Sequence, residues 1–506
     1  MLEILKEALF LLFDPSNLLL LILGVIAGSL AGCLPGITAT MSIALIVPFT
    51  FTMPPATGLI TIAGIYMGAT YGGSISAILV NTPGTPANIA TTFDGYPMTQ
   101  KGNAQRALVA AATASAVGGI VGTFFLLFFS PPLADAALKF GPPEFFWLAI
   151  FGLTIIVSLS ADNMLKGFIG GAFGLLLSTI GISPIGGEPR FTWGIHQLNI
   201  GIDIIVALIG FFCLPQVFLM VENRFKKFKV AEYTSNKDEV LKDIMDSLKK
   251  PFILLYSSII GAFVGAVPGA GGNIAGMLSY NESKRFSKYP AKFGTGIIDG
   301  VVAAESANNA AVSGSLIPLL SLGIPGSPPS AVLLGALLLQ GIRPGQELYS
   351  QHAAVTYSFI LSLAVASVLL IPIGVFGARV MARFIASPIN YLATTIVYLS
   401  VIGSFAIHNN LVEVYIMAIF GLLGYLMHKF GFEGGPIVLG LILGSFAEEG
   451  LVQSIIFAKA SGSLFKVLFT RPISIVLIIF CLVSISWPII SKIRNQKNNN
   501  EGEVPS

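Results

Sequence analysis

The most constraining feature of this sequence is a set of four Pro-Gly pairs, each of which interrupts an apolar segment. They form two matching sets, because residues 28–39 resemble residues 261–272 and residues 81–86 resemble residues 323–328. A helix at membrane depth can be broken only where the break is buried in protein or lines a wet cavity. Matched breaks in two halves of a chain indicate the binding site of a transporter. The four pairs are Pro35-Gly36, Pro83-Gly84, Pro268-Gly269 and Pro325-Gly326.

The composition is that of a membrane protein. Of the 506 residues, 54% are hydrophobic and only 10% are charged, and the mean hydropathy is +0.83. In a soluble domain about a quarter of the residues are charged. We therefore predict an all-α polytopic membrane protein with about 11–12 membrane segments. The formal net charge of +3, without a long basic run, does not indicate a nucleic-acid partner.

The repeat extends beyond the breaks. Asn163 and Gly174 match Asn410 and Gly421 at a constant offset. Each half therefore corresponds to about one membrane domain. The predicted organisation is an interfacial helix at 1–14, transmembrane repeat 1 at 15–221, a cytoplasmic linker at 222–250, transmembrane repeat 2 at 251–469, a final transmembrane helix at 470–491 and a cytoplasmic tail at 492–506.

Loop charge predicts how the two repeats are oriented. The linker and the tail are the most basic loops, so the positive-inside rule places both in the cytoplasm. Repeat 2 and the final transmembrane helix together start and end in the cytoplasm, so repeat 2 alone crosses the membrane an odd number of times. An odd number of crossings inverts the topology of one repeat relative to the other. The basic loop at 283–292 and its uncharged counterpart at 51–56 agree with this inversion. The Pro-Gly segments are either re-entrant hairpins or broken spanning helices, and loop charge favours a hairpin around Pro268-Gly269.

A Pro-Gly break has a chemical consequence. It exposes backbone amides at the start of a new half-helix, where they and the helix dipole favour an anion. Unwound carbonyls beside the break suit a cation such as sodium. The alternative interpretation is that Pro and Gly only kink the helices, but four breaks in repeat register favour a substrate site. The candidate substrate-binding residues are Pro35, Gly36, Thr38, Asn81, Thr82, Pro83, Gly84, Thr85, Asn88, Pro268, Gly269, Asn273, Pro325, Gly326 and Ser327.

A second candidate site lies in the apolar stretch at 295–322. Glu305, Asn309 and Ser313 are four residues apart, so they share one face of a helix, and Asn308 lies beside them. An ionisable group inside a membrane span indicates an ion or substrate pathway. We assign Glu305, Asn308, Asn309 and Ser313 to a coupling-ion site for Na⁺ or H⁺. The competing interpretation is a protonated Glu305 that holds two helices together.

The remaining polar residues indicate no other chemistry. The few cysteines and histidines show neither metal-ligand nor disulfide spacing, so we predict no bound metal and no cofactor besides the coupling ion. No catalytic constellation is present, so we predict that the protein is not an enzyme. Glu448-Glu449, late in the chain, we interpret as loop or capping residues.

In these motifs and their order the chain resembles the large membrane subunit (TctA-like) of the tripartite tricarboxylate transporter family. The resemblance covers nearly all of residues 15–490. The matching motifs are the glycine-rich run that ends at Pro35-Gly36, the block from Tyr71-Gly72-Gly73-Ser74 to Pro86, the run Val264-Gly265-Ala266-Val267-Pro268-Gly269, the run Glu305-Ser306-Ala307-Asn308-Asn309-Ala310 and the run Gly323-Ile324-Pro325-Gly326-Ser327-Pro328.

The resemblance implies secondary active uptake of organic carboxylates, driven by an ion gradient, across a bacterial inner membrane. It also implies two protein partners, a small membrane subunit and a periplasmic substrate-binding protein. A stand-alone ion-coupled anion carrier is the alternative. A channel is a weaker alternative, because selectivity filters use rings of charge or of carbonyl groups around an oligomer axis.

Overall fold

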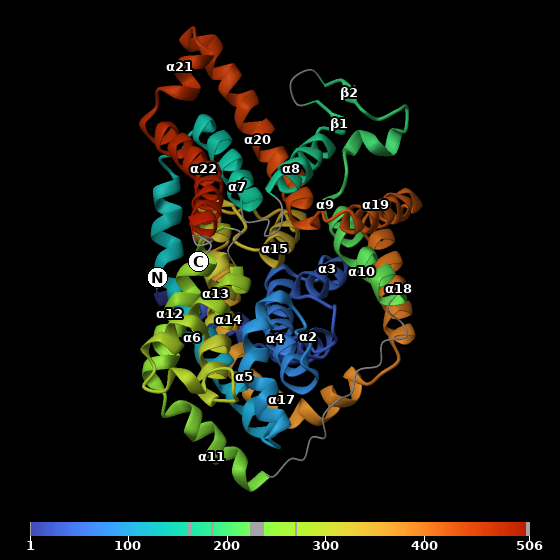
Figure 1. Ribbon diagram of the computed structural model, residues 1–506. Coiled ribbons are helices and arrows are strands. Elements are labelled where there is room, and N and C mark those ends of the chain that lie inside the picture. Colours follow the sequence, from blue (N-terminus) through green and yellow to red (C-terminus); the bar gives the residue numbers. More distant parts are fainter. Residues whose placement is uncertain (1, 159–163, 184–186, 223–236, 269–270, 502–506) are drawn as a thin grey trace. The chain divides into compact units, whose positions relative to one another are not determined.

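The computed structural model describes residues 2–158, 164–183, 187–222, 237–268 and 271–501 (Figure 1). These residues form helices, apart from one short antiparallel pair of strands, β1 (Gly181–Ile182) and β2 (Pro189–Arg190). Within the described residues, 8 helices are long and apolar enough to cross a membrane, or 9 if α11 and α12, bent by 68° at their junction, form one span. The predicted class, an all-α polytopic membrane protein, is confirmed.

The chain divides into two compact units, and we describe each by itself. The larger unit contains residues 1–137 and 205–425, and the smaller unit contains residues 138–204 and 426–506. Each unit takes elements from both halves of the sequence. The predicted repeat and domain boundaries are not tested by this grouping and stay predictions.

The larger unit contains all four Pro-Gly pairs. Its elements are α1 (Leu2–Leu12), α2 (Pro15–Gly32), α3 (Ala39–Thr50), α4 (Pro55–Val80), η1 (Pro86–Asn88), α5 (Ile89–Gln100), α6 (Ala104–Ala137), α9 (Ile204–Leu208), η3 (Ile209–Cys213), α10 (Leu214–Glu222), α11 (Lys237–Leu248), α12 (Pro251–Ala266), α13 (Gly271–Phe286), η4 (Pro290–Lys292), α14 (Ile298–Leu322), α15 (Pro328–Leu339), α16 (Gln346–Ser350), α17 (Ala353–Ile385), α18 (Ile389–His408) and α19 (Leu411–Lys429).

Small residues let α2 and α4 lie side by side with their backbones in contact (Figure 1). A Cβ atom on Gly28 would clash with the carbonyl oxygen of Ile65, and one on Gly32 would clash with that of Ala69. The order of these contacts shows that α2 and α4 run parallel. A side chain at either glycine would force the two helices apart.

The second half repeats this packing with α12 and α14. A Cβ atom on Gly261 would clash with the carbonyl oxygen of Ala307, and one on Gly265 would lie 2.5 Å from that of Ala311. The helix before the first break therefore packs on the helix before the second break in the same way in both halves.

In each half, the helix before the second break begins beside the start of the helix before the first break. The Thr57 hydroxyl, at the start of α4, donates to Asn17 Oδ1, at the start of α2, over 2.7 Å. In the second half Lys250, just before α12, lies 2.7 Å from the Asp299 carboxylate at the start of α14. The segments α2–α3 and α12–α13 are thus helical hairpins, with Pro35-Gly36 between the two helices of the first and Pro268 after the first helix of the second.

The helices that precede the second Pro-Gly pair of each half, α4 and α14, run antiparallel. Tyr66 on α4 hydrogen bonds Ser315 late in α14 over 3.2 Å, whereas Ser74, later in α4, donates to Glu305 early in α14 over 2.6 Å. The helix α6 also packs along α14, and Ser115 of α6 reaches the same carboxylate oxygen of Glu305 as Ser74 of α4. Nearly every residue of α14 is buried as a result.

The smaller unit consists of α7 (Pro142–Ser158), α8 (Met164–Ser178), the two strands, η2 (His196–Ile200), α20 (Gly434–Ser461), α21 (Leu464–Phe469) and α22 (Pro472–Glu501). The helix α20, from the second half of the chain, packs on α7 and α8 from the first half. Glu448 lies inside α20 and pairs with Arg190 over 2.7 Å. The interpretation of Glu448-Glu449 as loop or capping residues was wrong, because both residues lie in the interior of α20, which continues through Gly450 to Ser461.

Candidate functional site

The structure contains a helix break at each predicted position. In the two second breaks the preceding helix ends at a residue in the left-handed conformation, Asn81 (φ 53) after α4 and Gly323 (φ 75) after α14. Asn and Gly adopt this conformation most readily, so both are suited to terminate a helix. Gly36 also has a positive φ of 93. Gly269 lies outside the described residues.

The two second breaks fold back onto their own helices in the same way. The Gly84 amide donates to the Gly73 carbonyl of α4 over 3.3 Å, and the Gly326 amide donates to the Ser315 carbonyl of α14 over 3.3 Å. Each glycine also abuts the last turn of the preceding hairpin helix, at Gly32 or Gly265. The two amides that the sequence assigned to substrate are therefore already bonded within the protein.

Several predicted ligands serve as helix caps. The Thr38 hydroxyl accepts from the Met41 amide over 3.2 Å at the start of α3. Ser327 and Ser330 form a reciprocal capping box at the start of α15, in which the Ser327 amide donates to Ser330 Oγ over 2.8 Å. Such caps satisfy amides that a helix start leaves unpaired. These hydroxyls fix the half-helices in place.

Breaks from the two halves meet beside α14. A Cβ atom on Gly272, at the start of α13, would lie 3.3 Å from Ala87 Cβ in η1 and 2.6 Å from Asn308 Oδ1. Ser327, after the last break, lies 3.0 Å from the Tyr66 hydroxyl of α4. Elements that follow three of the four breaks thus enclose the middle of α14.

Two buried amides of α14, one of which (Asn308) lies at this meeting point, have no partner among the described residues. Asn308 is 1% exposed and Asn309 is fully buried, and neither the oxygen nor the nitrogen of either side chain is hydrogen bonded within that part of the chain. An unsatisfied buried polar group costs about 1–3 kcal/mol, so such groups are rare without a functional reason. Asn308 and Asn309 offer donors for a carboxylate and carbonyl oxygens for a cation.

Comparison of Asn308 with Asn88 gives a testable prediction. Asn88 is also buried, but it accepts from Thr85 over 2.7 Å and donates to Ser74 and to the Thr70 carbonyl. We expect Asn88→Ala to lower the thermal stability of the purified protein by about 1–3 kcal/mol, because it leaves these partners unpaired. Asn308→Ala should leave stability unchanged or raise it, yet abolish transport. A loss of stability in Asn308→Ala equal to that in Asn88→Ala would show that Asn308 has only a structural role.

Glu305 is the buried acid at the centre of the site. It is fully buried, and its Oε2 accepts from Ser74 of α4 over 2.6 Å and from Ser115 of α6 over 3.1 Å. Its Oε1 accepts from the Thr91 hydroxyl of α5. Within the described residues its recorded partners are these three hydroxyl groups and the side chain of Asn88, so this carboxyl group is solvated by donors and is not neutralised by a basic side chain.

The remaining members of the predicted coupling site lie along the same helix. Ser313 is buried, and its hydroxyl lies 3.3 Å from that of Thr123 on α6. Glu305 contacts the same helix through Ser115, so Glu305 and Ser313 both face α6. Two of the described candidate substrate residues are exposed, Asn81 after α4 and Asn273 on α13.

The first break of the first half lines a cavity of about 330 Å³. Pro35 and Thr82, from the two breaks of that half, lie in its wall with Gln216 of α10. A Cβ atom on Gly36 would clash with the Gln216 amide, so this side chain covers the break directly. Pockets for small ligands start at about 300 Å³, so the cavity can admit a small anion.

Sequence reasoning missed three polar residues of these sites. They are Gln216, Thr91 and Ser115, and they reach the cavity or Glu305 from α10, α5 and α6. Gln216 could have been found, because a glutamine inside an apolar span is unusual. Thr91 and Ser115 give no such signal, since single hydroxyl residues are frequent in membrane helices.

A polytopic helical protein with matched helix breaks around buried, unpartnered amides has the architecture of a membrane transport protein. Comparison with known proteins agrees. The chain belongs to the tripartite tricarboxylate transporter TctA family, whose model matches residues 18–439. The resemblance noted in the sequence is therefore confirmed.

Two relatives come from Agrobacterium vitis. An uncharacterized 52.8 kDa protein in the TAR-I ttuC' 3'region is 37% identical over 484 residues, which cover 96% of this chain and 95% of that protein. An uncharacterized protein in the TAR-II ttuC' 3'region is 36% identical over 238 residues, or 47% of this chain and 97% of that protein. No solved structure matches the chain.

Proposed function

We propose that this protein is the large membrane subunit of a secondary transporter that imports organic di- or tricarboxylates with Na⁺ or H⁺. The observation that carries the proposal is the pair of buried, unpartnered amides, Asn308 and Asn309, among elements that follow three of the helix breaks. Family membership supports transport of a tricarboxylate. The substrate carboxylates would accept hydrogen bonds from these amides and from the half-helix N-termini.

Glu305 is proposed to hold the coupling cation or proton. It lies one helical turn from Asn308 and Asn309, so a cation bound near its carboxylate can also reach their carbonyl oxygens. Hydroxyl donors on α4, α5 and α6 stabilise the carboxylate until the ion arrives. A substrate anion and a coupling cation beside each other would neutralise one another in a buried site, which makes their joint transfer favourable.

We further propose that the two halves have inverted topology in the membrane. Two observations support this proposal. The packing of α2 on α4 recurs as that of α12 on α14, and the equivalent helices α4 and α14 run antiparallel. A two-fold axis in the membrane plane produces this relation, and it underlies alternating access in many carriers.

Cysteine labelling tests the inversion. Thr52, in the turn after α3, and Lys284, in the last turn of α13, are exposed residues at the equivalent ends of the two hairpins. In a variant without the native cysteines, we expect Thr52→Cys to react with an impermeant maleimide from the periplasm and Lys284→Cys to react only after the cells are permeabilised. Labelling of both residues from the same side of the membrane would contradict the inverted arrangement.

Membership of a tripartite family supports the presence of partners, and we propose that they are a small membrane subunit and a periplasmic binding protein that delivers the substrate. The site of action is then a bacterial inner membrane. A stand-alone carrier would not need a delivery protein, so the two arrangements differ in their dependence on it.

Reconstitution tests this function. We expect proteoliposomes with both membrane subunits to accumulate radiolabelled citrate or a related carboxylate only with an imposed Na⁺ or H⁺ gradient and the binding protein. Uptake without the binding protein would favour the stand-alone carrier. If a panel of di- and tricarboxylates gives no gradient-dependent uptake with all three proteins present, the proposed function is wrong.

A further inference from the structure

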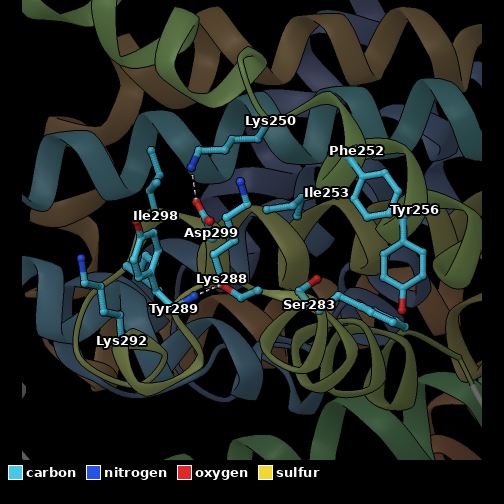
Figure 2. Close-up of a pocket in the computed structure, with 13 residues that line it drawn as sticks. Lys250, Phe252, Ile253, Tyr256, Ser283, Lys288, Tyr289, Lys292, Ile298 and Asp299 are labelled. Carbon is cyan, nitrogen blue, oxygen red and sulfur yellow. Dashed lines mark hydrogen bonds and ion pairs between the residues drawn. The ribbon is translucent and has the colours of Figure 1, made fainter.

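A second cavity of the larger unit, of about 430 Å³, lies at the end of the α12–α13 hairpin (Figure 2). Its wall contains three lysines, Lys250, Lys288 and Lys292, and one acid, Asp299. The cavity is therefore cationic. It contains none of the residues assigned to substrate or to the coupling ion.

Of the three lysines in the wall, one is neutralised by an acid and two keep N–H donors available for an anion. Asp299 binds Lys250 over 2.7 Å, as Figure 2 shows, and so neutralises that lysine. The Lys292 ammonium lies 4.5 Å from the centre of the Tyr289 ring, which attracts it but leaves its N–H donors available. For Lys288 no ion pair exists among the described residues. Two lysines can thus donate to an anion in the cavity.

The wall also contains aromatic side chains, several of which are exposed. Phe252 and Tyr256 lie together on the side of the cavity away from Lys292 and Tyr289 (Figure 2), and their rings stack at 5.8 Å. Phe252 is 71% exposed and Phe286 is 63% exposed. Such exposed phenylalanine rings are unfavourable in water and suit the lipid interface, where aromatic residues gather.

The helix α11, next to the cavity in the sequence, also indicates that the cavity lies at the membrane surface. The helix α11, which ends two residues before Lys250, is strongly amphipathic, and its apolar residues Leu241 and Met245 are exposed. Asp243 and Asp246 of this helix pair with Arg106, and its exposed apolar residues suit the headgroup region of a bilayer. The cavity therefore opens where acyl chains and headgroups meet, and its basic character places it on the cytoplasmic side.

We propose that this cavity binds the phosphate of an anionic phospholipid from the cytoplasmic leaflet. Lys288 and Lys292 would donate to the phosphate oxygens, and Phe252 and Phe286 would pack against the acyl chains. Basic pockets between membrane helices are suited to anionic headgroups. A bound lipid would connect the two arms of the hairpin to the start of α14, the helix that carries Glu305.

Lipid titration of the purified, delipidated protein in neutral detergent, followed by native mass spectrometry, tests the proposal. We expect phosphatidylglycerol to bind at least about tenfold more tightly than phosphatidylcholine. The double variant Lys288→Gln/Lys292→Gln should lose about 25-fold in affinity for phosphatidylglycerol, since a lysine near an anionic lipid contributes about fivefold. The matched control, Lys284→Gln, removes a charge at the same end of α13 from a residue outside the cavity wall and should stay within about twofold.

Three results would overturn the proposal. Equal binding of the two lipids to the unaltered protein would show no preference for an anionic lipid, and this measurement does not depend on any variant. Unchanged phosphatidylglycerol binding in the cavity variant would place the lipid elsewhere. If glycerol 3-phosphate or citrate bound as tightly as the lipid and displaced it, the cavity would be a site for soluble anions.

Discussion

Glu305→Gln is expected to lower gradient-driven uptake by about 100-fold while the protein still inserts into the membrane. The carboxylate accepts hydroxyl donors from Ser74, Ser115 and Thr91. Hydrogen bonds to a charged group contribute about 1.5–3 kcal/mol, and the upper value corresponds to about 100-fold. Glutamine retains the shape but removes the charge that would hold the coupling ion. Initial rates of uptake in proteoliposomes, at matched protein content, give the comparison.

A matched control is available on α13. Glu282 is partly exposed and makes only a surface pair with Arg285 at 3.5 Å, so Glu282→Gln should transport normally. Glu305→Asp keeps the charge and should retain more uptake than Glu305→Gln, even if both variants lose some stability. Normal ion-driven accumulation by Glu305→Gln would assign Glu305 a structural role between helices.

The positions of the breaks could be predicted from the sequence because their causes are local. Proline removes an amide and glycine permits a positive φ, so a Pro-Gly pair interrupts a helix whatever surrounds it. The shared face of Glu305 and Ser313 was also predictable, since it depends only on helical periodicity. Both side chains do face α6.

The use of the polar residues could not be predicted in the same way. Thr38 and Ser327 cap helix starts, which was not predicted from the sequence, because a hydroxyl at a helix start bonds the backbone nearest to it. Their role in substrate binding stays a prediction. The partners of Glu305 come from three helices far apart in the sequence, and single-chain periodicity does not identify such contacts. For the same reason the packing of α20 on α7 and α8 was not foreseen.

The largest effects on stability are expected at Gly84 and Gly326. A Cβ atom on Gly84 would clash with the Gly32 carbonyl and lie 2.6 Å from Gly73 Cα. One on Gly326 would lie 2.8 Å from the Gly265 carbonyl and equally close to Ser315 backbone atoms. Backbone cannot rotate away as a side chain can, so the break and the hairpin must separate. We expect each glycine-to-alanine change to cost about 1–3 kcal/mol or more.

Gly435→Ala is the control for these changes. Among the described residues, no heavy atom outside its own helix turn lies within 4 Å of a Cβ atom at Gly435, and this glycine is in the first turn of α20. Alanine favours a helix over glycine by up to about 1 kcal/mol, so this variant should melt at the same temperature as the unaltered protein or higher. Thermal melting followed by size-exclusion chromatography ranks the three variants. Gly84→Ala or Gly326→Ala that melts like the control would show that the breaks are not packed against backbone.

The stability of Gly36→Ala shows whether crowding or backbone conformation requires a glycine at the first break. Its Cβ atom would meet the side chain of Gln216, which can move, but the positive φ of Gly36 disfavours any residue with a Cβ atom. The left-handed conformation costs such a residue about 1–2 kcal/mol. We therefore expect Gly36→Ala to be less destabilising than Gly84→Ala, and adding Gln216→Ala should not restore its stability. Full rescue by Gln216→Ala would mean that crowding alone, and not the backbone conformation, requires glycine at the first break.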